Sequence, residues 1–378
     1  MSEQTDQKRT LDRFNALMRG EGLSNSVLPK LTETQMRQYI KRLQVDLKDA
    51  RKSFLSDQIV KNEIIGLGKI EPEIPSWVLM PSKKPTRGPG VPTLFCSDWH
   101  YGEVVRPDEI NGKNSYNIQI ANRRIQSLVA STVKLLKNHI TNPEYPGIIL
   151  ALGGDMLSGD IHEELSETNE EPMMKILMAL YGKMIWVIDN LRAEFGRVFI
   201  PVVAGNHGRT SRKPRAKRRA HTNYDWLLGA LLQKHYEGDK NVVVMVSEGP
   251  DLRYSVYGYR YLLTHGDQFR GGDGITGALM PIVRGDHKKR SRNAQIDMDY
   301  DTMLMGHWHQ FFHTPRIIVN SSLKGLDEYA YQCNFPYEPP SQSLWITNAK
   351  RGITFMLPVM VDRDTKKAPT NDWVAWEK

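Results

Sequence analysis

The sequence predicts a layered α/β fold, in which a sandwich of two β-sheets is flanked by helices and preceded by a helical N-terminal extension. Strand-like and helix-like segments alternate from residue 91 to residue 241, and strand-like segments dominate from residue 242 onward. This order is typical of layered α/β domains. In addition, five short apolar runs end in Gly, Asp, Asn or His, which indicates strands whose carboxyl ends carry related side chains. The runs are residues 91–96, 147–152, 198–204, 259–263 and 302–305.

The composition is that of a folded chain in a reducing compartment. With 378 residues, 40% of them hydrophobic, the chain can bury the core of one large domain or of two smaller ones. The cysteines are Cys96 and Cys333, too few for a disulfide framework, so we expect a cytoplasmic protein. No apolar run approaches the ~20 residues that span a bilayer, and the start, MSEQTDQKRT, lacks the apolar core of a secretory signal. We therefore expect no membrane association.

The first ninety residues divide into an arm, a helical extension and a connector. Residues 1–30 are polar and predict a flexible arm, and residues 31–90 predict a helix followed by a proline-rich connector. Apolar residues with alternating spacings of four and three predict the helix: Met36, Ile40, Leu43, Leu47, Ala50 and Phe54. This narrow apolar seam either packs against the chain's own domain or forms a homo-oligomer or partner contact. Prolines at positions 72, 75, 81, 85, 89 and 92 predict an extended connector without helix.

The remaining residues, 91–378, predict one domain. Amphipathic spacing predicts helices at residues 118–136, 172–195 and 224–236. Alternating or continuous apolar residues predict strands at 242–246, 252–258, 259–265, 316–319, 344–347 and 353–361. Glycines at 271, 272, 274 and 277 indicate either a flexible flap or an ordinary surface loop.

Metal-ligand side chains follow the five apolar runs. In CSDWHYGE, residues 96–103, Asp98 and His100 are separated by one residue, and alternation along an extended backbone would point them to one side. Similar residues end the other runs, so that the full candidate set is Asp98, His100, Asp155, Asn206, His265, His307 and His309. Each alone would be an ordinary turn or cap residue. Together, oxygen and imidazole ligands without thiolate suit Mn²⁺, Fe, Zn²⁺ or similar ions, and seven ligands suit two ions that share a carboxylate.

The order DxH, GD, GNH, HG and GHxH over residues 96–309 resembles the calcineurin-like metallophosphoesterase family, and it is most similar to the prokaryotic and phage nuclease branch that includes the Mre11 and SbcD exonucleases. The resemblance implies a metallophosphoesterase-like fold, two divalent ions, and a phage or bacterial origin. We expect Mn²⁺, with Fe, Zn²⁺ or Ni²⁺ as alternatives. One ion would be held by Asp98, His100 and His309, the other by Asn206, His265 and His307, with Asp155 bridging.

The resemblance also implies a role for His207, which matches the family histidine that contacts the scissile phosphate and helps the leaving group depart. Two ions would activate a water for in-line hydrolysis. The family usually has Asp or Glu after this histidine, but this chain has Gly208. A carboxylate there would orient the ring, so the general-acid role of His207 is open, and Asp160, His162 or His221 are alternative partners.

A basic run follows directly, and the net charge of +8 is concentrated in such runs. The stretch RTSRKPRAKRR supplies the predicted substrate-binding residues Arg209, Arg212, Lys213, Arg215, Lys217, Arg218 and Arg219. We expect a second group, Lys288, Lys289, Arg290 and Arg292, on a loop at the same cleft. A solvated loop is the alternative explanation. Beside a phosphoesterase centre, contacts with several phosphates of a nucleic acid explain the run better, with little sequence preference.

The sequence therefore predicts a dimetal phosphodiesterase that is a DNA or RNA nuclease. A phosphatase or small-nucleotide phosphodiesterase is the alternative enzyme, and a catalytically silent scaffold subunit is the alternative outside enzymes. The expected partner is nucleic acid. The resemblance would allow a companion ATPase, but nothing in this chain indicates one.

Overall fold

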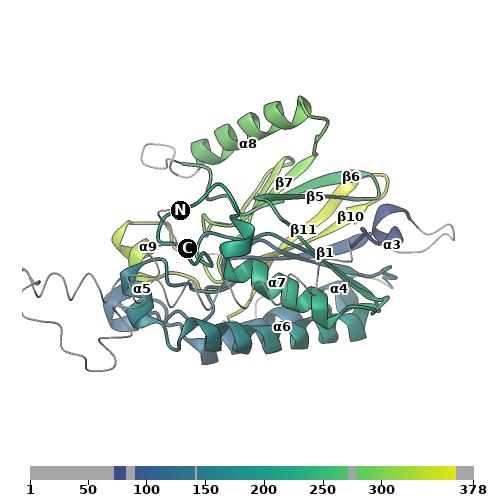
Figure 1. Cartoon of the computed structure of the whole chain (residues 1–378). Helices are drawn as coiled ribbons and strands as arrows, with labels where there is room; N and C mark the ends of the chain where they lie inside the picture. Colours follow the sequence, from purple (N-terminus) through teal and green to yellow (C-terminus); the bar gives the residue numbers. More distant parts are fainter. Residues whose placement is uncertain (1–71, 82–89, 141–142, 271–276, 278, 363–378) are drawn as a thin grey trace, which may run out of the picture. The chain divides into compact units, whose positions relative to one another are not determined.

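The computed structural model describes residues 72–81, 90–140, 143–270, 277 and 279–362 (Figure 1). They all belong to one compact unit, Ser56–Lys378. The predicted arm, the predicted helix at residues 36–54 and the glycine cluster at 271–274 lie outside the described residues.

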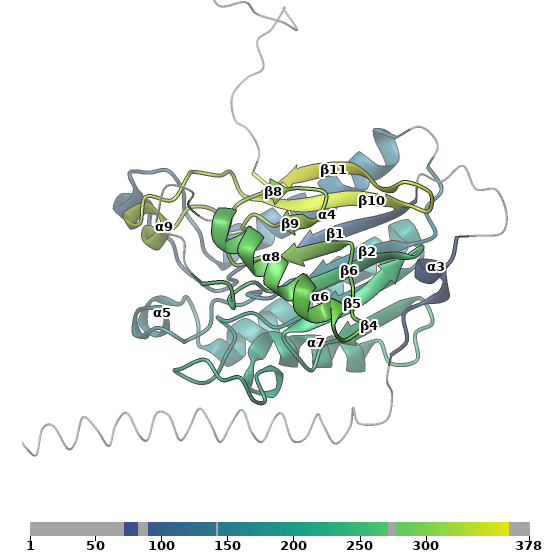
Figure 2. The same cartoon turned by 90° about the horizontal axis from the view of Figure 1, so that it is seen from above.

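The larger sheet has six strands in the order β11-β10-β1-β2-β3-β4, and Figure 2 shows β10 and β11 at one edge and β4 toward the other. Strands β1 to β4 are parallel, whereas β10 and β11 are antiparallel additions. The strands are β1 (Val91–Cys96), β2 (Ile148–Leu152), β3 (Val198–Val202), β4 (Val242–Val246), β10 (Ser341–Asn348) and β11 (Gly352–Met360). Every residue of β1, β2 and β3 is buried, as expected for parallel strands covered on both faces.

The second sheet has five strands in the order β5-β6-β7-β9-β8. The first pair, β5 and β6, forms a hairpin that turns at Gly258, and β6, β7 and β9 are parallel neighbours. The strands are β5 (Asp251–Val256), β6 (Tyr259–Thr264), β7 (Thr302–Met305), β8 (Phe312–His313) and β9 (Ile317–Val319). These two sheets confirm the predicted sandwich and all the strands predicted from the sequence.

The helices lie outside the two sheets. The three long helices predicted from the sequence are confirmed as α4 (Ile118–Asn138), α6 (Met173–Phe195) and α7 (Tyr224–His235). Their ends carry the expected signals: Asn117 and Asn223 cap α4 and α7 with their side chains, and α6 begins after Pro172 and ends at Gly196. The other helices of the described residues are α3 (Ser76–Leu79), α5 (Glu163–Thr168), α8 (Leu279–Ala294), α9 (Glu328–Gln332) and the 3-10 turns η1 (Pro107–Ile110) and η2 (Ala220–Thr222).

Three hydrophobic clusters define the layers. The first lies between the six-stranded sheet and α4, α6 and α7, the second between the two sheets, and the third between the five-stranded sheet and α8 (Figure 1). Alternation along β1 shows how one strand serves two layers, because Leu94 and Cys96 belong to the first cluster and Phe95 to the second. The carboxyl ends of the central strands are thereby fixed between rigid layers.

Two sequence predictions need correction. The connector predicted to lack helix contains the single turn α3, which begins directly after Pro75, where a missing N–H costs no helical hydrogen bond. The second basic group lies on α8 and not on a loop. Its charges are used locally, since Lys289 Nζ lies 2.6 Å from Asp251 Oδ1 and Arg290 Nε donates to Asp286 over 2.8 Å.

Among the described residues, no helix combines the length and the apolar content that crossing a bilayer requires.

Candidate metal centre

The seven candidate ligands lie on five loops, which leave the carboxyl ends of β1, β2, β3, β6 and β7. Backbone hydrogen bonds join these loops. Asp98 N donates to Gly154 O and Gly306 N to His265 O, each over 3.0 Å. Parallel strands end at the same edge of a sheet, and the two sheets are packed on each other, so residues from positions 98 to 309 meet in one place, where α/β proteins commonly bind ligands.

The backbone of these loops is unusual, because five of the seven candidate ligands have positive φ: Asp98 (55°), His100 (45°), Asp155 (52°), His307 (69°) and His309 (53°). Residues other than Gly rarely adopt this conformation, and it persists where the surroundings impose it. The argument from strand alternation is wrong for Asp98 and His100, since β1 ends at Cys96. Tight turns bring both side chains into the site.

The first group of ligands is Asp98, His100 and His309, whose ligand atoms lie within 4.8 Å of one another. The two imidazoles face each other, with 3.1 Å between their Nε2 atoms, and His309 Nε2 lies 3.4 Å from Asp98 Oδ1. Asp98 and His100 are buried, and His309 is partly open to solvent. Two nitrogens and an oxygen directed at one point form a suitable donor set for a divalent transition metal.

The second group is Asp155, His265 and His307, also within 4.8 Å. His265 Nε2 lies 2.9 Å from Asp155 Oδ2 and 3.0 Å from Asn206 Oδ1, so the asparagine completes this set. Asp155 belongs to a further cluster with His100 and His207, and it therefore lies between the two groups. The structure thus brings together all seven residues singled out in the sequence, in the same two sets.

At two positions next to candidate ligands only glycine fits, because the carboxylate of Asp155 or Asp98 approaches the backbone closely. A Cβ atom on Gly205 would lie 2.1 Å from Asp155 Oδ1, and one on Gly306 would lie 2.2 Å from Asp98 Oδ2. Both distances are far below van der Waals contact. The Gly-Asn and Gly-His pairs of the sequence are therefore a steric consequence of packing the ligand loops together.

Polar contacts at Nδ1 orient two of the candidate ligand histidines. His265 Nδ1 lies 2.9 Å from Gly153 O, and His100 Nδ1 lies 3.3 Å from Glu103 Oε2. A carbonyl oxygen only accepts, so His265 carries a proton on Nδ1, and its Nε2 is directed at Asp155. Such contacts behind a metal ligand fix the ring and its tautomer, and Glu103 has this position behind His100.

The ionisation of the site suits a cation. Burial is the main cause that lowers the pKa of both His100 and His307 to about 4, so both rings are neutral at pH 7 and offer lone pairs. Burial alone would lower the pKa of His265, but the charge and hydrogen bond of Asp155 raise it to about 10. The carboxylate that favours a proton on His265 would favour a metal cation in the same way.

The ring of His207 is held by a main-chain carbonyl. Its Nδ1 donates to Ser158 O over 2.9 Å, and its backbone N–H donates to Asp155 Oδ1 over 2.6 Å. The sequence argument considered only side chains as orienting partners. The His162 ring lies 6.0 Å from that of His207, and His221 pairs with a glutamate of another loop. The carbonyl of Ser158 is thus the group that orients the His207 ring.

Asp225 was not foreseen, although it connects two ligand loops. This buried carboxylate accepts hydrogen bonds from the backbone N–H groups of Asp155 (2.9 Å), Met156 (3.1 Å) and Gly205 (2.9 Å). Burial and the charge of Asp155 raise the pKa of Asp225 to about 6, while these hydrogen bonds act in the opposite direction. Nothing in the sequence separates it from an ordinary acidic residue in the first turn of a helix.

A buried ion cluster supports the site from the side of His100. Lys324 is 2% exposed, and its Nζ lies 2.8 Å from Glu103 Oε1 and also bonds to Asp327. Burial alone would lower the pKa of Lys324, but the charges of Asp327 and Glu103 raise it. The lysine therefore neutralises two carboxylates that have little contact with water.

Lys324→Met is expected to lower the free energy of unfolding by about 3–5 kcal/mol, because it leaves Glu103 and Asp327 charged and buried. The native lysine lowers the pKa of Glu103, so its stabilisation is present above the ordinary carboxyl pKa and declines in acid. The difference in free energy of unfolding between the native protein and the variant should therefore become smaller below about pH 5. Urea unfolding at pH 7 and pH 4 tests this. Lys175→Met removes an exposed lysine that pairs with Glu171 and serves as the control.

The basic run forms a loop with a closed neck. Tyr224 N donates to Gly208 O over 2.7 Å, and Thr210 N donates to Thr222 O over 2.8 Å. We call residues 209–222 the basic loop. The loop begins two residues after His207 and ends just before α7, so its base is fixed beside the candidate ligands.

The seven cations of the basic loop fall into two classes. Arg219 makes a two-pronged contact with Asp267 (2.7 and 2.8 Å), and Arg209 Nη1 donates to Asn206 O over 2.8 Å. These two arginines tie the loop to its surroundings. The other five are exposed: Arg212, Lys213, Arg215, Lys217 and Arg218.

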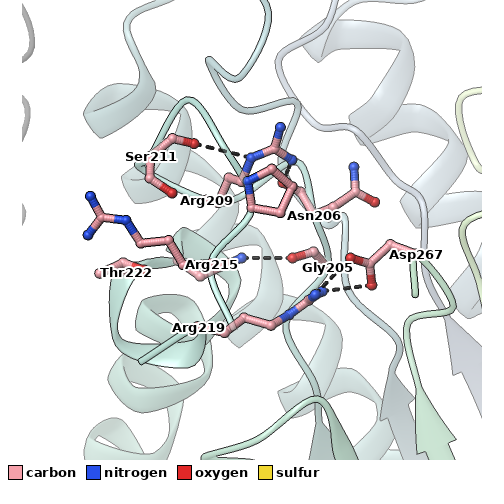
Figure 3. Close-up of a pocket in the computed structure, with 10 residues that line it drawn as sticks. Gly205, Asn206, Arg209, Ser211, Arg215, Arg219, Thr222 and Asp267 are labelled. Atoms are coloured by element: carbon pink, nitrogen blue, oxygen red, sulfur yellow. Dashed lines mark hydrogen bonds and ion pairs between the residues drawn. The ribbon is translucent and has the colours of Figure 1, made fainter. Parts of the chain in front are cut away.

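A hollow between the basic loop and the second ligand group is shown in Figure 3. Arg209, Arg215 and Arg219 lie around it, together with the candidate ligand Asn206 and with Asp267. Asp267 balances one of the three guanidinium groups. The side chains that line the hollow therefore carry a net positive charge directly beside the candidate metal centre.

No family model matches the sequence, and no curated protein matches it. Three solved structures are distantly similar, each at 11% identity. Vps29 from Entamoeba histolytica, complexed with Zn²⁺, aligns over 71% of this chain and 99% of its own, with a TM-score of 0.27. A conserved uncharacterized protein from Streptococcus pneumoniae, a predicted phosphoesterase, aligns over 67% and 81%, with a TM-score of 0.25. The sulfate thiohydrolase SoxB from Thermus thermophilus aligns over 74% and 58%, with a TM-score of 0.29. Because these TM-scores are low, the fold of this chain is assigned from its own strand order and layers.

Proposed function

We propose that this protein is a phosphoesterase that depends on two divalent cations and hydrolyses phosphodiester bonds in nucleic acids. The observation that carries the proposal is the meeting of two ligand groups at Asp155. The residues that would hold the ions are Asp98, His100 and His309 in one group, and Asn206, His265 and His307 in the other, with Asp155 between them. Their order along the chain supports the proposal, because it resembles the calcineurin-like metallophosphoesterases and their Mre11/SbcD-like nuclease branch.

Two such ions, when bound, supply an activated water and neutralise the phosphate oxygens. The protein's own groups then position the reactants. Asp155 holds the backbone of His207 through its 2.6 Å hydrogen bond, and Ser158 O fixes the ring through Nδ1. When the ring is protonated, its Nε2–H can be donated to the departing oxygen. His207 is therefore the proposed general acid.

The choice of nucleic acid rests on the basic loop. Five exposed cations lie on a segment whose neck begins one residue after His207. A phosphomonoester presents a single phosphate, whereas a nucleic acid presents a row of phosphates that such a loop can neutralise. The described residues place no equally dense group of exposed cations elsewhere, since the group on α8 is largely paired.

Metal removal and restoration test the core of the proposal. We expect protein treated with a chelator to lose activity and to melt at a lower temperature, and Mn²⁺ to restore both. Binding at one hundred times the dissociation constant adds about 2.7 kcal/mol for one site. The substrates are bis(p-nitrophenyl) phosphate, p-nitrophenyl phosphate, and single- and double-stranded DNA and RNA. Cleavage of the monoester alone would indicate a phosphatase, and no turnover with Mn²⁺, Fe²⁺, Zn²⁺ or Ni²⁺ would contradict the proposal.

Arg215→Gln is expected to weaken binding of oligonucleotides and to reduce the slope of log K against log[salt] by about 1, the value for one lost phosphate contact. Turnover of bis(p-nitrophenyl) phosphate should not change, because that substrate has no neighbouring phosphate. Arg351→Gln removes an equal charge at the turn between β10 and β11, at the other end of β1 from the site, and is the matched control. Equal slopes for the two variants would count against a role of the basic loop.

A further inference from the structure

A cluster of exposed aromatic side chains lies on α9 and the segment after it. Tyr329 is 67% exposed, Tyr331 41%, Phe335 44% and Tyr337 59%. In the described part of the chain, the other exposed Phe, Tyr or Trp side chains are Trp186, at 36%, and Phe355, at 47%. Four such residues within nine positions are costly in water and indicate a surface that something covers. We call these four residues the aromatic surface.

The aromatic surface is held by specific contacts. Asp327 caps α9 by accepting from Ala330 N over 2.7 Å, and Phe335 N donates to Ala330 O over 2.9 Å. The rings of Tyr329 and Phe335 meet edge to face, with 5.8 Å between their centroids. Because Asp327 also belongs to the buried cluster of Lys324, the aromatic surface is connected to the support of the metal centre.

Phe335, one residue of the aromatic surface, borders the first ligand group of the candidate metal centre, whereas the basic loop borders the second. One hollow is lined by His309 and Trp308 together with Phe335 and Pro336. The hollow at the basic loop contains Asn206 instead, and the two hollows share no lining residue. A substrate bound between the two ligand groups would thus meet cations beyond one group and aromatic rings beyond the other.

The charge of the aromatic surface excludes phosphate as its ligand. Residues 325–340 contain no Lys or Arg; Asp327 is neutralised by Lys324, and Glu328 and Glu338 add negative charge. Acidic side chains repel phosphates, whereas the face of a tyrosine or phenylalanine ring stacks on a nucleobase of any sequence. A base is free to stack in this way only when it is unpaired or flipped out of the duplex.

We propose that the aromatic surface stacks on unpaired nucleobases next to the scissile phosphate, so that the enzyme acts on single-stranded or frayed nucleic acid. This inference rests on the proposed function and adds the strandedness of the substrate. The phosphates run past the basic loop, and the bases on the other side of the cut lie against Phe335 and its neighbours.

Phe335→Ala is expected to raise KM for single-stranded oligothymidylate about tenfold, the usual effect of losing one base stack. It should leave kcat for the same oligothymidylate at saturation near the native value, because the loss lies in binding the base, and Phe335→Trp should restore the native KM. Phe355→Ala, 47% exposed on β11, removes a similar ring elsewhere and is the matched control. Tyr337→Ala provides a second, more exposed position in the aromatic surface in case Phe335→Ala destabilises the protein.

The outcomes separate this inference from the proposed function. If the native protein with Mn²⁺ cleaves no phosphodiester at all, the proposed function fails. If it cleaves bis(p-nitrophenyl) phosphate and DNA, but Phe335→Ala and Tyr337→Ala leave KM for single strands unchanged, the stacking proposal is overturned and a protein partner becomes the better occupant. A blunt duplex cleaved more efficiently than a single strand of the same sequence would also overturn it.

Discussion

Asp155→Asn is expected to lower kcat for any phosphodiester by about 10³-fold or more. Asp155 is the residue that connects the two ligand groups, with Oδ2 2.9 Å from His265 Nε2 and Oδ1 accepting from His207 N. The substitution preserves shape but removes the charge that the two proposed ions would share. Each 1.36 kcal/mol of lost transition-state stabilisation costs a factor of ten, and a metal in such a site supplies several kcal/mol.

The measurement is kcat with bis(p-nitrophenyl) phosphate together with the metal content of the purified protein. We expect the variant to retain less metal than the native protein. Asp299→Asn changes an exposed carboxylate near Arg260 and is the control for the chemical change itself. A variant with full metal content and more than a tenth of native kcat would contradict the central role of Asp155.

His207→Asn is expected to lower kcat by about 10²- to 10⁴-fold for a dinucleotide, whose leaving group is a poor alkoxide that needs a proton. The same variant should lose much less activity with bis(p-nitrophenyl) phosphate, because nitrophenolate leaves without protonation. The metal ligands remain in place, so metal content should equal that of the native protein.

The contrast between the two substrates is what distinguishes a general acid from a residue that only positions the phosphate. His162→Asn changes the neighbouring ring, 6.0 Å away, and is the matched control. An equal loss on both substrates would assign His207 to phosphate binding, and no loss on either would remove it from the reaction.

The candidate ligands could be predicted from sequence because each one follows a short apolar strand. Strand position is encoded locally by hydrophobic runs, and parallel strands bring their ends together regardless of the details between them. The reason given for Asp98 and His100 was nevertheless wrong. Both residues have positive φ in the loop that follows β1, and no local pattern in the sequence reports this conformation.

The supporting residues could not be predicted for two physical reasons. Asp225 acts on the backbone of residues 20 and 70 positions away, and Ser158 acts through a carbonyl that every residue possesses. The helix α8 was missed because Pro281 and Gly285 lower its intrinsic propensity. Tertiary contacts stabilise it, among them the ion pair between Lys289 and Asp251.

The neck of the basic loop makes the exposed residues of the loop structurally independent of the candidate metal centre. Hydrogen bonds between Gly208 and Tyr224 and between Thr210 and Thr222 close the loop at its base, so the exposed residues 212–218 can change in number and charge without displacing His207 or Asp225. Loop length itself costs little, since doubling it adds only about 0.6 kcal/mol of closure entropy. Grafting a segment of different charge onto this neck is therefore a route to hydrolases of altered preference that keep one unchanged reaction centre.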